Sequence, residues 1–346
     1  MRRKALETNN VAGSHCPVRS RPRDMGELTP AHAVVSYAAC VAGAGILANF
    51  AALAGLIRKF RKGLFSILLQ LAVADIITLA GPAVLELWYR NEQTWTFGKQ
   101  ACMAYGGLQV LTSTASVYLT IIIVLHTFAT ITLEEISCNR VKRSDDDEIR
   151  SSRHSLVNSD SSTPRTLTID YKMVNARVPV LIPSVIVWTL AVSLSIPAFQ
   201  LANTTRLGNN TETCTYLEPS HRVIMYSMLS LFNLFIPTAI LCAFSVLIII
   251  KLKSKWLLSG LDDLKPGLKL SLWLIVTYLV LCLPRCLLDS FIIYSSPEVL
   301  KEPVPKLGLA TTCIYMLASL CRPLLSISLL LTLRRISSSR DKTRDV

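Results

Sequence analysis

Seven long apolar stretches, each interrupted by only a few polar residues, divide this chain into regular segments. They cover roughly residues 34–57, 65–89, 102–133, 177–200, 223–250, 268–293 and 308–332. A hydrocarbon core about 30 Å thick requires about 20 apolar residues in helical conformation, and each stretch reaches that length. Because backbone groups in lipid must be hydrogen-bonded internally, the pattern predicts helices rather than strands. The predicted fold class is an all-α membrane protein, a seven-transmembrane helix bundle.

Composition and charge agree with this prediction. Apolar residues make up 51% of the chain, charged residues only 17%, and the mean hydropathy is +0.44. The net charge of +13 could indicate a nucleic-acid partner, but the basic residues cluster in alternate loops, after the first, fifth and seventh stretches. These clusters are Arg58–Lys62, Lys251–Lys255 and Arg334–Arg335. The positive-inside bias therefore places the N-terminus outside and the C-terminus in the cytosol, with no nucleic-acid partner.

The loop between the fourth and fifth stretches carries two features of an extracellular segment. Asn203 and Asn209 begin N-glycosylation sequons, which support the predicted orientation. Cys214 follows in the same loop, and Cys102 lies at the outer end of the third stretch. An oxidising exterior allows these two cysteines to pair, which would tie the loop to the bundle.

The remaining polar segments define the predicted domain organisation: an extracellular tail, the bundle and a short cytosolic tail, over residues 1–33, 34–333 and 334–346. The tail lacks the apolar run of a signal peptide, and a translation start at Met25 instead of Met1 would remove its basic residues. The second cytosolic loop, about residues 134–176, is dense in charge, which predicts disorder. It is interpreted as a solvated spacer or a phosphorylated regulatory loop.

No residue pattern supports enzyme chemistry. The histidines are scattered, and no zinc-protease, nucleophile-elbow or phosphate-loop motif occurs, so we expect no catalytic residues, metal or other cofactor. A membrane transporter is the weakest alternative, because transporters usually contain related halves and no internal repeat is visible here.

Several motifs, in order along the chain, resemble the rhodopsin-like (class A) G-protein-coupled receptors. The most specific is Leu71-Ala72-Val73-Ala74-Asp75, which is similar to the second-helix LAxAD motif. The other matches are Asn49 in the first helix, Thr94–Gly98 in the first outer loop, Cys102 and Cys214 as the family disulfide, Trp188, Pro237, Pro284 and Pro323. The resemblance covers residues 34–340. It implies a multi-pass plasma-membrane receptor that binds an extracellular ligand and signals to a heterotrimeric G protein.

Four switch motifs of that family are altered. The third helix ends in His126-Thr127-Phe128 instead of Asp-Arg-Tyr, Leu281–Pro284 lacks the toggle Trp, Arg322–Ser326 replaces NPxxY, and Ser245 replaces a Tyr. G-protein coupling is therefore in question. The alternative is an atypical, non-coupling receptor that acts as scavenger, scaffold, or homo- or hetero-dimer partner.

Two ionisable residues are expected at bilayer depth, where charge is costly unless it is paired inside the bundle. Asp75 lies in the second stretch and Arg322 in the seventh. In the family, an Asn at the position of Arg322 helps that Asp to hold a sodium ion. We predict a core switch of Asn49, Asp75 and Arg322 in which an Asp75–Arg322 ion pair replaces sodium. The alternative is that Arg322 extends to the cytosolic interface.

Toward the outside, four polar residues form a candidate ligand pocket: Glu86, Gln109, Arg285 and Asp289. Arg285 and Asp289 are one helical turn apart and share a face. Charges of both signs suit a peptide, which is the favoured ligand, or a small zwitterion. Ion pairs of Arg285 with Glu86 or Asp289 that serve only structure are the alternative. In the family, amine receptors carry an Asp at the position of Gln109, so a monoamine ligand is not expected.

Overall fold

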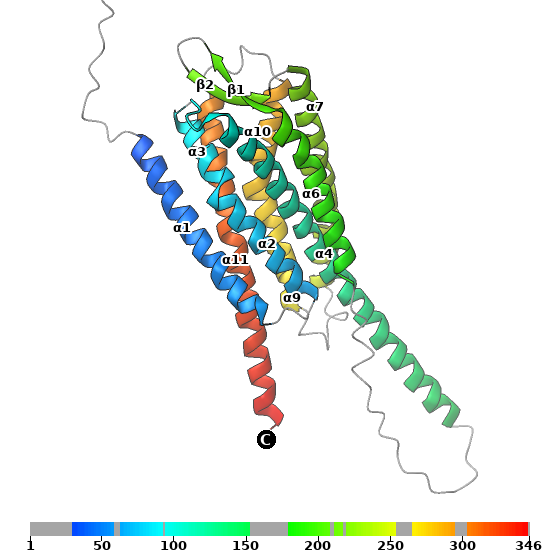
Figure 1. The fold of residues 1–346 in the computed structure, drawn as a ribbon. Coiled ribbons are helices and arrows are strands. Elements are labelled where there is room, and N and C mark those ends of the chain that lie inside the picture. Colours follow the sequence, from blue (N-terminus) through cyan, green and yellow to red (C-terminus); the bar gives the residue numbers. More distant parts are fainter. Residues whose placement is uncertain are drawn as a thin grey trace, which may run out of the picture.

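The computed structural model describes residues 30–58, 63–92, 94–152, 179–207, 211–216, 219–253, 265–294 and 303–344. Within these residues, seven helical segments are long and apolar enough to cross a membrane: Ala33–Ile57, Gly63–Glu92, Gly98–Ile136, Leu181–Leu201, Ser220–Lys253, Lys265–Ile292 and Lys306–Ile336. They lie side by side as a bundle (Figure 1). The structure therefore confirms the prediction of seven helices whose length and composition suit a membrane span. Met25 and Asn209 lie outside the described residues.

Four of the predicted stretches are continuous helices, and three are divided. The continuous ones are α1 (Pro30–Ile57), α4 (Gly98–Ser152), α6 (Leu181–Leu201) and α11 (Pro303–Arg344). The divided ones are α2 (Gly63–Ala80) with α3 (Pro82–Glu92); α7 (Pro219–Leu229), the π-helical turn η1 (Ser230–Phe235) and α8 (Ile236–Lys253); and α9 (Lys265–Thr277), the π-helical turn η2 (Tyr278–Cys282) and α10 (Leu283–Tyr294).

Prolines explain why these helices are interrupted. Pro82 follows the break at Gly81, and Pro237 and Pro284 are the second residues after the two π-helical turns. Proline lacks the N–H that would bond to the carbonyl four residues earlier. For Pro237 that carbonyl belongs to Asn233, and the hydroxyl of Tyr278 donates to it at 3.1 Å. A neighbouring helix thus satisfies the freed backbone group, as an apolar environment requires.

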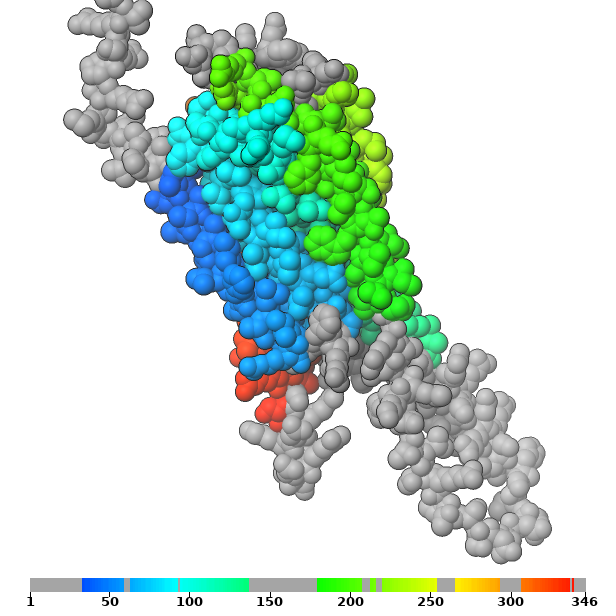
Figure 2. All heavy atoms as spheres, in the orientation of Figure 1, coloured from blue at the N-terminus to red at the C-terminus, as the bar shows by residue number. Residues whose placement is uncertain are grey.

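The distribution of side chains is the one that a bilayer favours. Asn49, Asp75 and Arg322 are buried inside the bundle, whereas Leu47 and Leu181 are exposed by 71% and 75% on its surface. Charged groups therefore avoid the surface that lipid would cover. Figure 2 shows one side of the bundle, where α1 (blue), α2 and α3 (blue to cyan) and α6 (green) lie at the surface.

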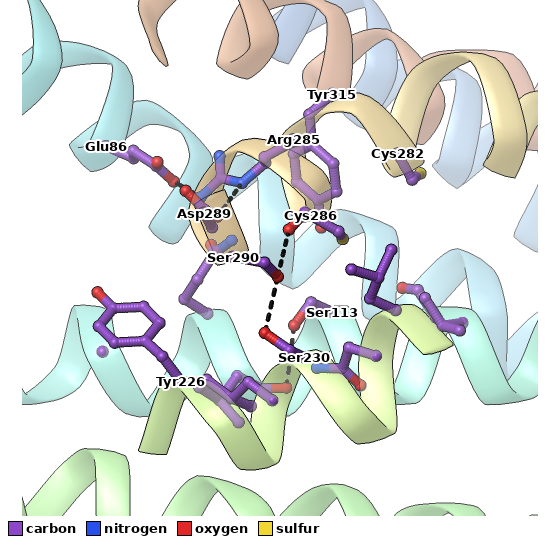
Figure 3. A pocket seen from close by; sticks show the side chains of 18 of the residues that line it. Glu86, Ser113, Tyr226, Ser230, Cys282, Arg285, Cys286, Asp289, Ser290 and Tyr315 are labelled. Carbon is purple, nitrogen blue, oxygen red and sulfur yellow. Dashed lines mark hydrogen bonds and ion pairs between the residues drawn. The ribbon is translucent and has the colours of Figure 1, made fainter. Parts of the chain in front are cut away.

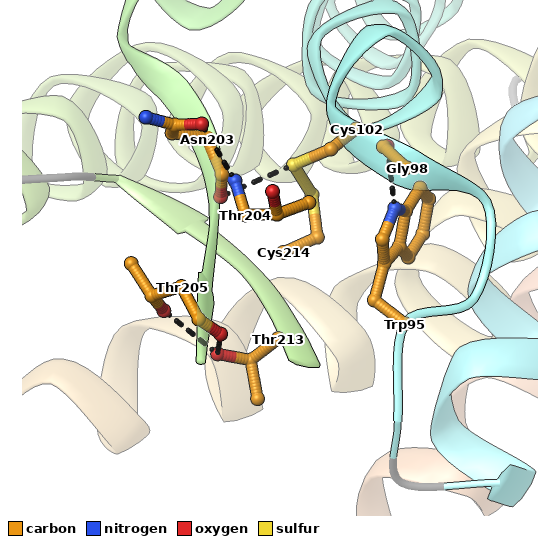
Figure 4. Close-up of a disulfide and its surroundings, with 8 residues drawn as sticks. All are labelled: Trp95, Gly98, Cys102, Asn203, Thr204, Thr205, Thr213 and Cys214. Atoms are coloured by element: carbon orange, nitrogen blue, oxygen red, sulfur yellow. Dashed lines mark hydrogen bonds between the residues drawn. A yellow bond between two sulfur atoms is a disulfide. The ribbon is translucent and has the colours of Figure 1, made fainter. Parts of the chain in front are cut away.

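One end of the bundle, called the hairpin end below, carries an antiparallel pair of strands that the sequence pattern did not predict. Strands β1 (Ala202–Leu207) and β2 (Thr211–Tyr216) pair with Thr204 opposite Cys214. The predicted disulfide between Cys102 and Cys214 is present and joins β2 to the first turns of α4 (Figure 4). Asn203, the described sequon residue, lies in β1.

The loop that contains Trp95 also holds the hairpin. Trp95 is 1% exposed, its backbone N–H donates to the carbonyl of Glu212 at 2.6 Å, and its indole N–H donates to the carbonyl of Gly98 at 2.9 Å. The hairpin is therefore fixed to the bundle by a covalent bond on one side and by a buried aromatic residue on the other.

Replacing Cys214 with serine is expected to destabilise the protein. The disulfide joins residues 112 apart in the sequence, so its loss restores much chain entropy to the unfolded state. Losses of about 2–5 kcal/mol are typical for such bonds. Thermal unfolding of the purified protein measures the effect, with Cys40→Ser as the control because Cys40 is an exposed free cysteine. Equal unfolding midpoints for the two variants would contradict the expectation.

At the opposite end of the bundle, the structure differs from the predicted disordered loop over 134–176. Residues 134–152 are helical and belong to α4, which continues beyond the bundle (Figure 1). The rest of that segment lies outside the described residues. Extending an existing helix adds one hydrogen bond per residue without a new nucleus, so charge density alone does not end it. An ion pair of 2.6 Å from Glu135 to Lys251 of α8 also holds the first added turn.

Candidate ligand pocket and polar core

A cavity of about 170 Å³ lies inside the bundle, toward the hairpin end (Figure 3). Side chains from α3, α4, α7, η1, η2, α10 and α11 line it. The four residues predicted for the pocket, Glu86, Gln109, Arg285 and Asp289, are all among them. The structure therefore brings together residues that lie as far apart in the sequence as Glu86 and Asp289.

The charged side chains of this cavity are paired with one another. Arg285 and Glu86 form a buried ion pair, and the Nε of Arg285 lies 3.5 Å from Asp289 Oδ2. Arg90 completes the cluster, with its Nε 2.8 Å from Glu86 Oε1 and its Nη2 3.3 Å from Asp289 Oδ1. Both internal ion pairs that were considered as the structural alternative are therefore present. They do not replace the pocket, because the same side chains line it.

Arg90 was missed by the sequence reasoning. Glu86 and Arg90 are one turn apart on α3, and Arg285 and Asp289 are one turn apart on α10. The spacing of four residues between Glu86 and Arg90 could have predicted this contact, because residues four apart lie next to each other on a helix. Two acidic and two basic groups from two helices thus form a set of linked ion pairs, which we call the charge cluster: Glu86, Arg90, Arg285 and Asp289.

Two residues of α11 also contact the charge cluster. Arg285 Nη1 donates to Thr312 Oγ1 at 3.4 Å, and the guanidinium of Arg285 lies 5.0 Å from the ring centre of Tyr315. A cation over an aromatic face is favourable, most of all where water is excluded. Helix α10 is therefore tied to α3 and α11 through one arginine.

Deeper in the bundle, the predicted ion pair between Asp75 and Arg322 is present. Arg322 Nη1 lies 2.7 Å from Asp75 Oδ1, and the hydroxyl of Ser319 donates to the same oxygen at 2.9 Å. Asn49 Nδ2 donates to the carbonyl of Ser319 at 3.0 Å, so α1 also joins this network. Arg322 is 4% exposed, so it does not extend to the interface.

A sodium ion does not fit beside this pair. The ion would share the carboxylate of Asp75 with a guanidinium nitrogen at 2.7 Å, and two cations so close repel each other strongly at low dielectric. Arg322 itself supplies the positive charge. Its other terminal nitrogen, Nη2, donates to the weak acceptor Cys282 Sγ at 3.3 Å.

The altered motif His126-Thr127-Phe128 lies at the end of the bundle opposite the hairpin. Thr127 is 5% exposed and donates to the carbonyl of Ile123 at 2.7 Å. Helix α9 approaches it closely, because a Cβ placed on Gly267 would lie 3.2 Å from Thr127 Cγ2. Thr127 therefore lies in a tight contact between α4 and α9.

The neighbours of Thr127 contact two other helices. His126 lies against Gly63 at the start of α2. Phe128 packs edge-on against Phe244 with ring centres 5.5 Å apart, and Lys251 lies 5.4 Å from its ring centre. Together with the ion pair from Lys251 to α4, these contacts link α4 to α8, a connection that the sequence did not reveal.

The fold and the buried charges define a multi-pass helical membrane protein with a polar cavity inside the bundle. No protein-family model matches this chain, and a search of curated proteins finds no match either. The residues and geometry of this chain are therefore the basis for its function.

Proposed function

We propose that this protein is a plasma-membrane receptor of the rhodopsin-like type, whose extracellular ligand binds in the cavity at the hairpin end. One observation carries the proposal: Arg322, the partner of Asp75, lines the same cavity as the charge cluster. A ligand in the cavity thus contacts, or lies next to, the buried ion pair that joins α2 to α11. Such a site can convert occupancy into a change of helix packing.

Orientation follows from charge and cysteine chemistry. The hairpin end of the bundle carries the disulfide. At the opposite end, basic residues lie where the fifth and seventh membrane-spanning segments finish: Lys251, Lys253, Arg334 and Arg335. A disulfide favours the extracellular side and basic residues favour the cytosolic side. We therefore assign the N-terminus to the outside and the C-terminus to the cytosol.

The favoured ligand is a peptide, of which only one residue-sized part enters the bundle. Typical small-molecule pockets measure about 300–1,000 Å³, so a cavity of about 170 Å³ holds one residue-sized group. The ligand acts by binding one arrangement of the helices better than another. The divided helices at Pro237 and Pro284, and Pro323 within α11, are the places at which such rearrangement is easiest.

A second candidate is a receptor of the same fold that does not couple to a G protein and serves as scavenger, scaffold or dimer partner. The threonine at position 127 favours this candidate, because receptors of the family carry at this position an arginine that engages the G protein.

G-protein activation in cells that express the wild type, with and without peptide-containing extracts, tests the proposal beside Thr127→Arg. We expect the wild type to respond to an extract. We expect Thr127→Arg to raise basal activity, because the longer, charged side chain would enter the tight contact with Gly267 and favour an outward movement of the start of α9. Thr130→Arg, three residues further along α4 and partly exposed, controls for the added charge.

The outcomes separate the two candidates once surface expression has been verified. A silent wild type beside an active Thr127→Arg variant favours the non-coupling receptor. Silence of the wild type and of both variants would contradict G-protein coupling altogether.

A further inference from the structure

Three residues that line the cavity each have a buried polar atom that makes no hydrogen bond within the described part of the chain: Gln109 Oε1, Ser116 Oγ and Asn233 Oδ1. Asn233 is 8% exposed, and its Nδ2 donates to Thr114 Oγ1 at 3.0 Å, which leaves the carbonyl oxygen unused. Amide carbonyl oxygens can only accept. Buried acceptors without a donor are costly, so a ligand that donates to them gains affinity that an acceptor-only ligand does not.

The cavity offers no unbalanced charge to attract an ion. The two acids and two bases of the charge cluster contact each other within 3.5 Å. The fifth charged lining residue, Arg322, is neutralised by Asp75 at 2.7 Å. A ligand group with a net charge would enter this region without a counter-ion, and an uncompensated buried charge is strongly unfavourable. The group that fits is therefore uncharged.

Size and wall chemistry restrict the group further. Apolar side chains from two sides, Val110 and Val117 of α4 with Leu229 and Leu234 of α7 and η1, form part of the wall. An engineered apolar cavity of about 150 Å³ in another protein holds one benzene molecule. A cavity of about 170 Å³ therefore holds one aromatic ring with a small polar substituent.

We propose that the cavity binds a single uncharged aromatic ring that carries an O–H or N–H donor, of the size of phenol or indole. The inference rests on the proposed function, since it treats the cavity as the ligand site. The hydroxyl or N–H donates to Gln109 Oε1, and the ring packs on the valines of α4. The ring belongs either to a tyrosine or tryptophan side chain of a peptide or to a free small molecule.

Ligand-observed fluorine NMR on the full-length protein in nanodiscs tests this proposal, with empty nanodiscs as the background. The probes are 4-fluorophenol, which donates; 4-fluoroanisole, which only accepts; and 4-fluorobenzoate, which is charged. We expect saturable broadening with 4-fluorophenol, roughly 2- to 10-fold weaker binding of 4-fluoroanisole through the loss of one hydrogen bond, and no saturable binding of 4-fluorobenzoate.

A matched pair of variants locates the acceptor. Gln109→Leu is expected to reduce the affinity for 4-fluorophenol to that for 4-fluoroanisole. Gln200→Leu, the same change at an exposed position of α6, is expected to leave it unchanged. Equal affinities for phenol and anisole, tightest binding of the benzoate, or equal effects of the two variants would each overturn the inference.

Two further comparisons separate the source of the ring from the proposed function. Displacement of 4-fluorophenol by N-acetyltyrosinamide supports a peptide residue, whereas displacement by p-cresol alone supports a free small molecule; failure of both overturns the inference. The binding assay contains no G protein. Ring binding without any cellular response therefore counts against coupling, and an extract response without ring binding counts against the ring alone.

Discussion

Replacing Arg322 with glutamine is expected to remove most of the protein from the cell surface. Asp75 is fully buried, and the change leaves it with only the hydroxyl of Ser319 among the partners described above. Breaking one side of a buried ion pair typically costs about 3–5 kcal/mol, because the remaining charge has no counter-ion. Flow cytometry of an epitope-tagged chain measures surface expression, and thermal unfolding of the purified protein measures stability.

The double variant Asp75→Asn with Arg322→Gln decides whether the pair itself is responsible. Removing both charges together is often close to neutral, so we expect surface expression to recover. Arg206→Gln is the matched control, because Arg206 also pairs with a carboxylate, Glu212, but its side chain is 83% exposed. If the double variant expresses as poorly as Arg322→Gln, the ion pair is not the cause.

Replacing Glu86 with glutamine is expected to have an effect of similar size. Glu86 is 1% exposed and is the carboxylate shared by Arg285 and Arg90. The variant keeps the shape of the side chain but leaves two cations facing each other, with Asp289 as the remaining acid of the charge cluster. We expect a loss of about 3–5 kcal/mol, measured by thermal unfolding, together with loss of any ligand response.

Two variants control this expectation. Glu92→Gln makes the same change six residues further along α3, at an exposed position outside the charge cluster, and we expect wild-type stability. Glu86→Gln combined with Arg285→Gln leaves Arg90 paired with Asp289 at 3.3 Å, so we expect partial recovery. Equal unfolding midpoints for Glu86→Gln and Glu92→Gln would show that the charge cluster does not stabilise the bundle.

The sequence by itself determined the number and approximate extent of the apolar helices, because the length of an apolar run is set by the thickness of a bilayer and not by packing. It also determined the partners of two long-range contacts. Cys102 and Cys214 do pair, and Asp75 does bind Arg322. The two cysteines were selected because both are expected on the oxidising outer side, and the ion pair was inferred from the resemblance to a family in which these two positions are neighbours.

Only the tertiary structure decided features that depend on how helices are rotated and brought together. Arg90 joins the charge cluster because α3 faces α10, and the side-chain carbonyls of Gln109 and Asn233 stay unpaired because no donor among the described residues reaches them. The close approach of Gly267 to Thr127 likewise depends on the path of α9. Hydrophobic patterning predicts which segments cross the membrane as helices. The orientation of each side chain within a few ångströms, which decides what the cavity can bind, follows from packing between segments far apart in the chain.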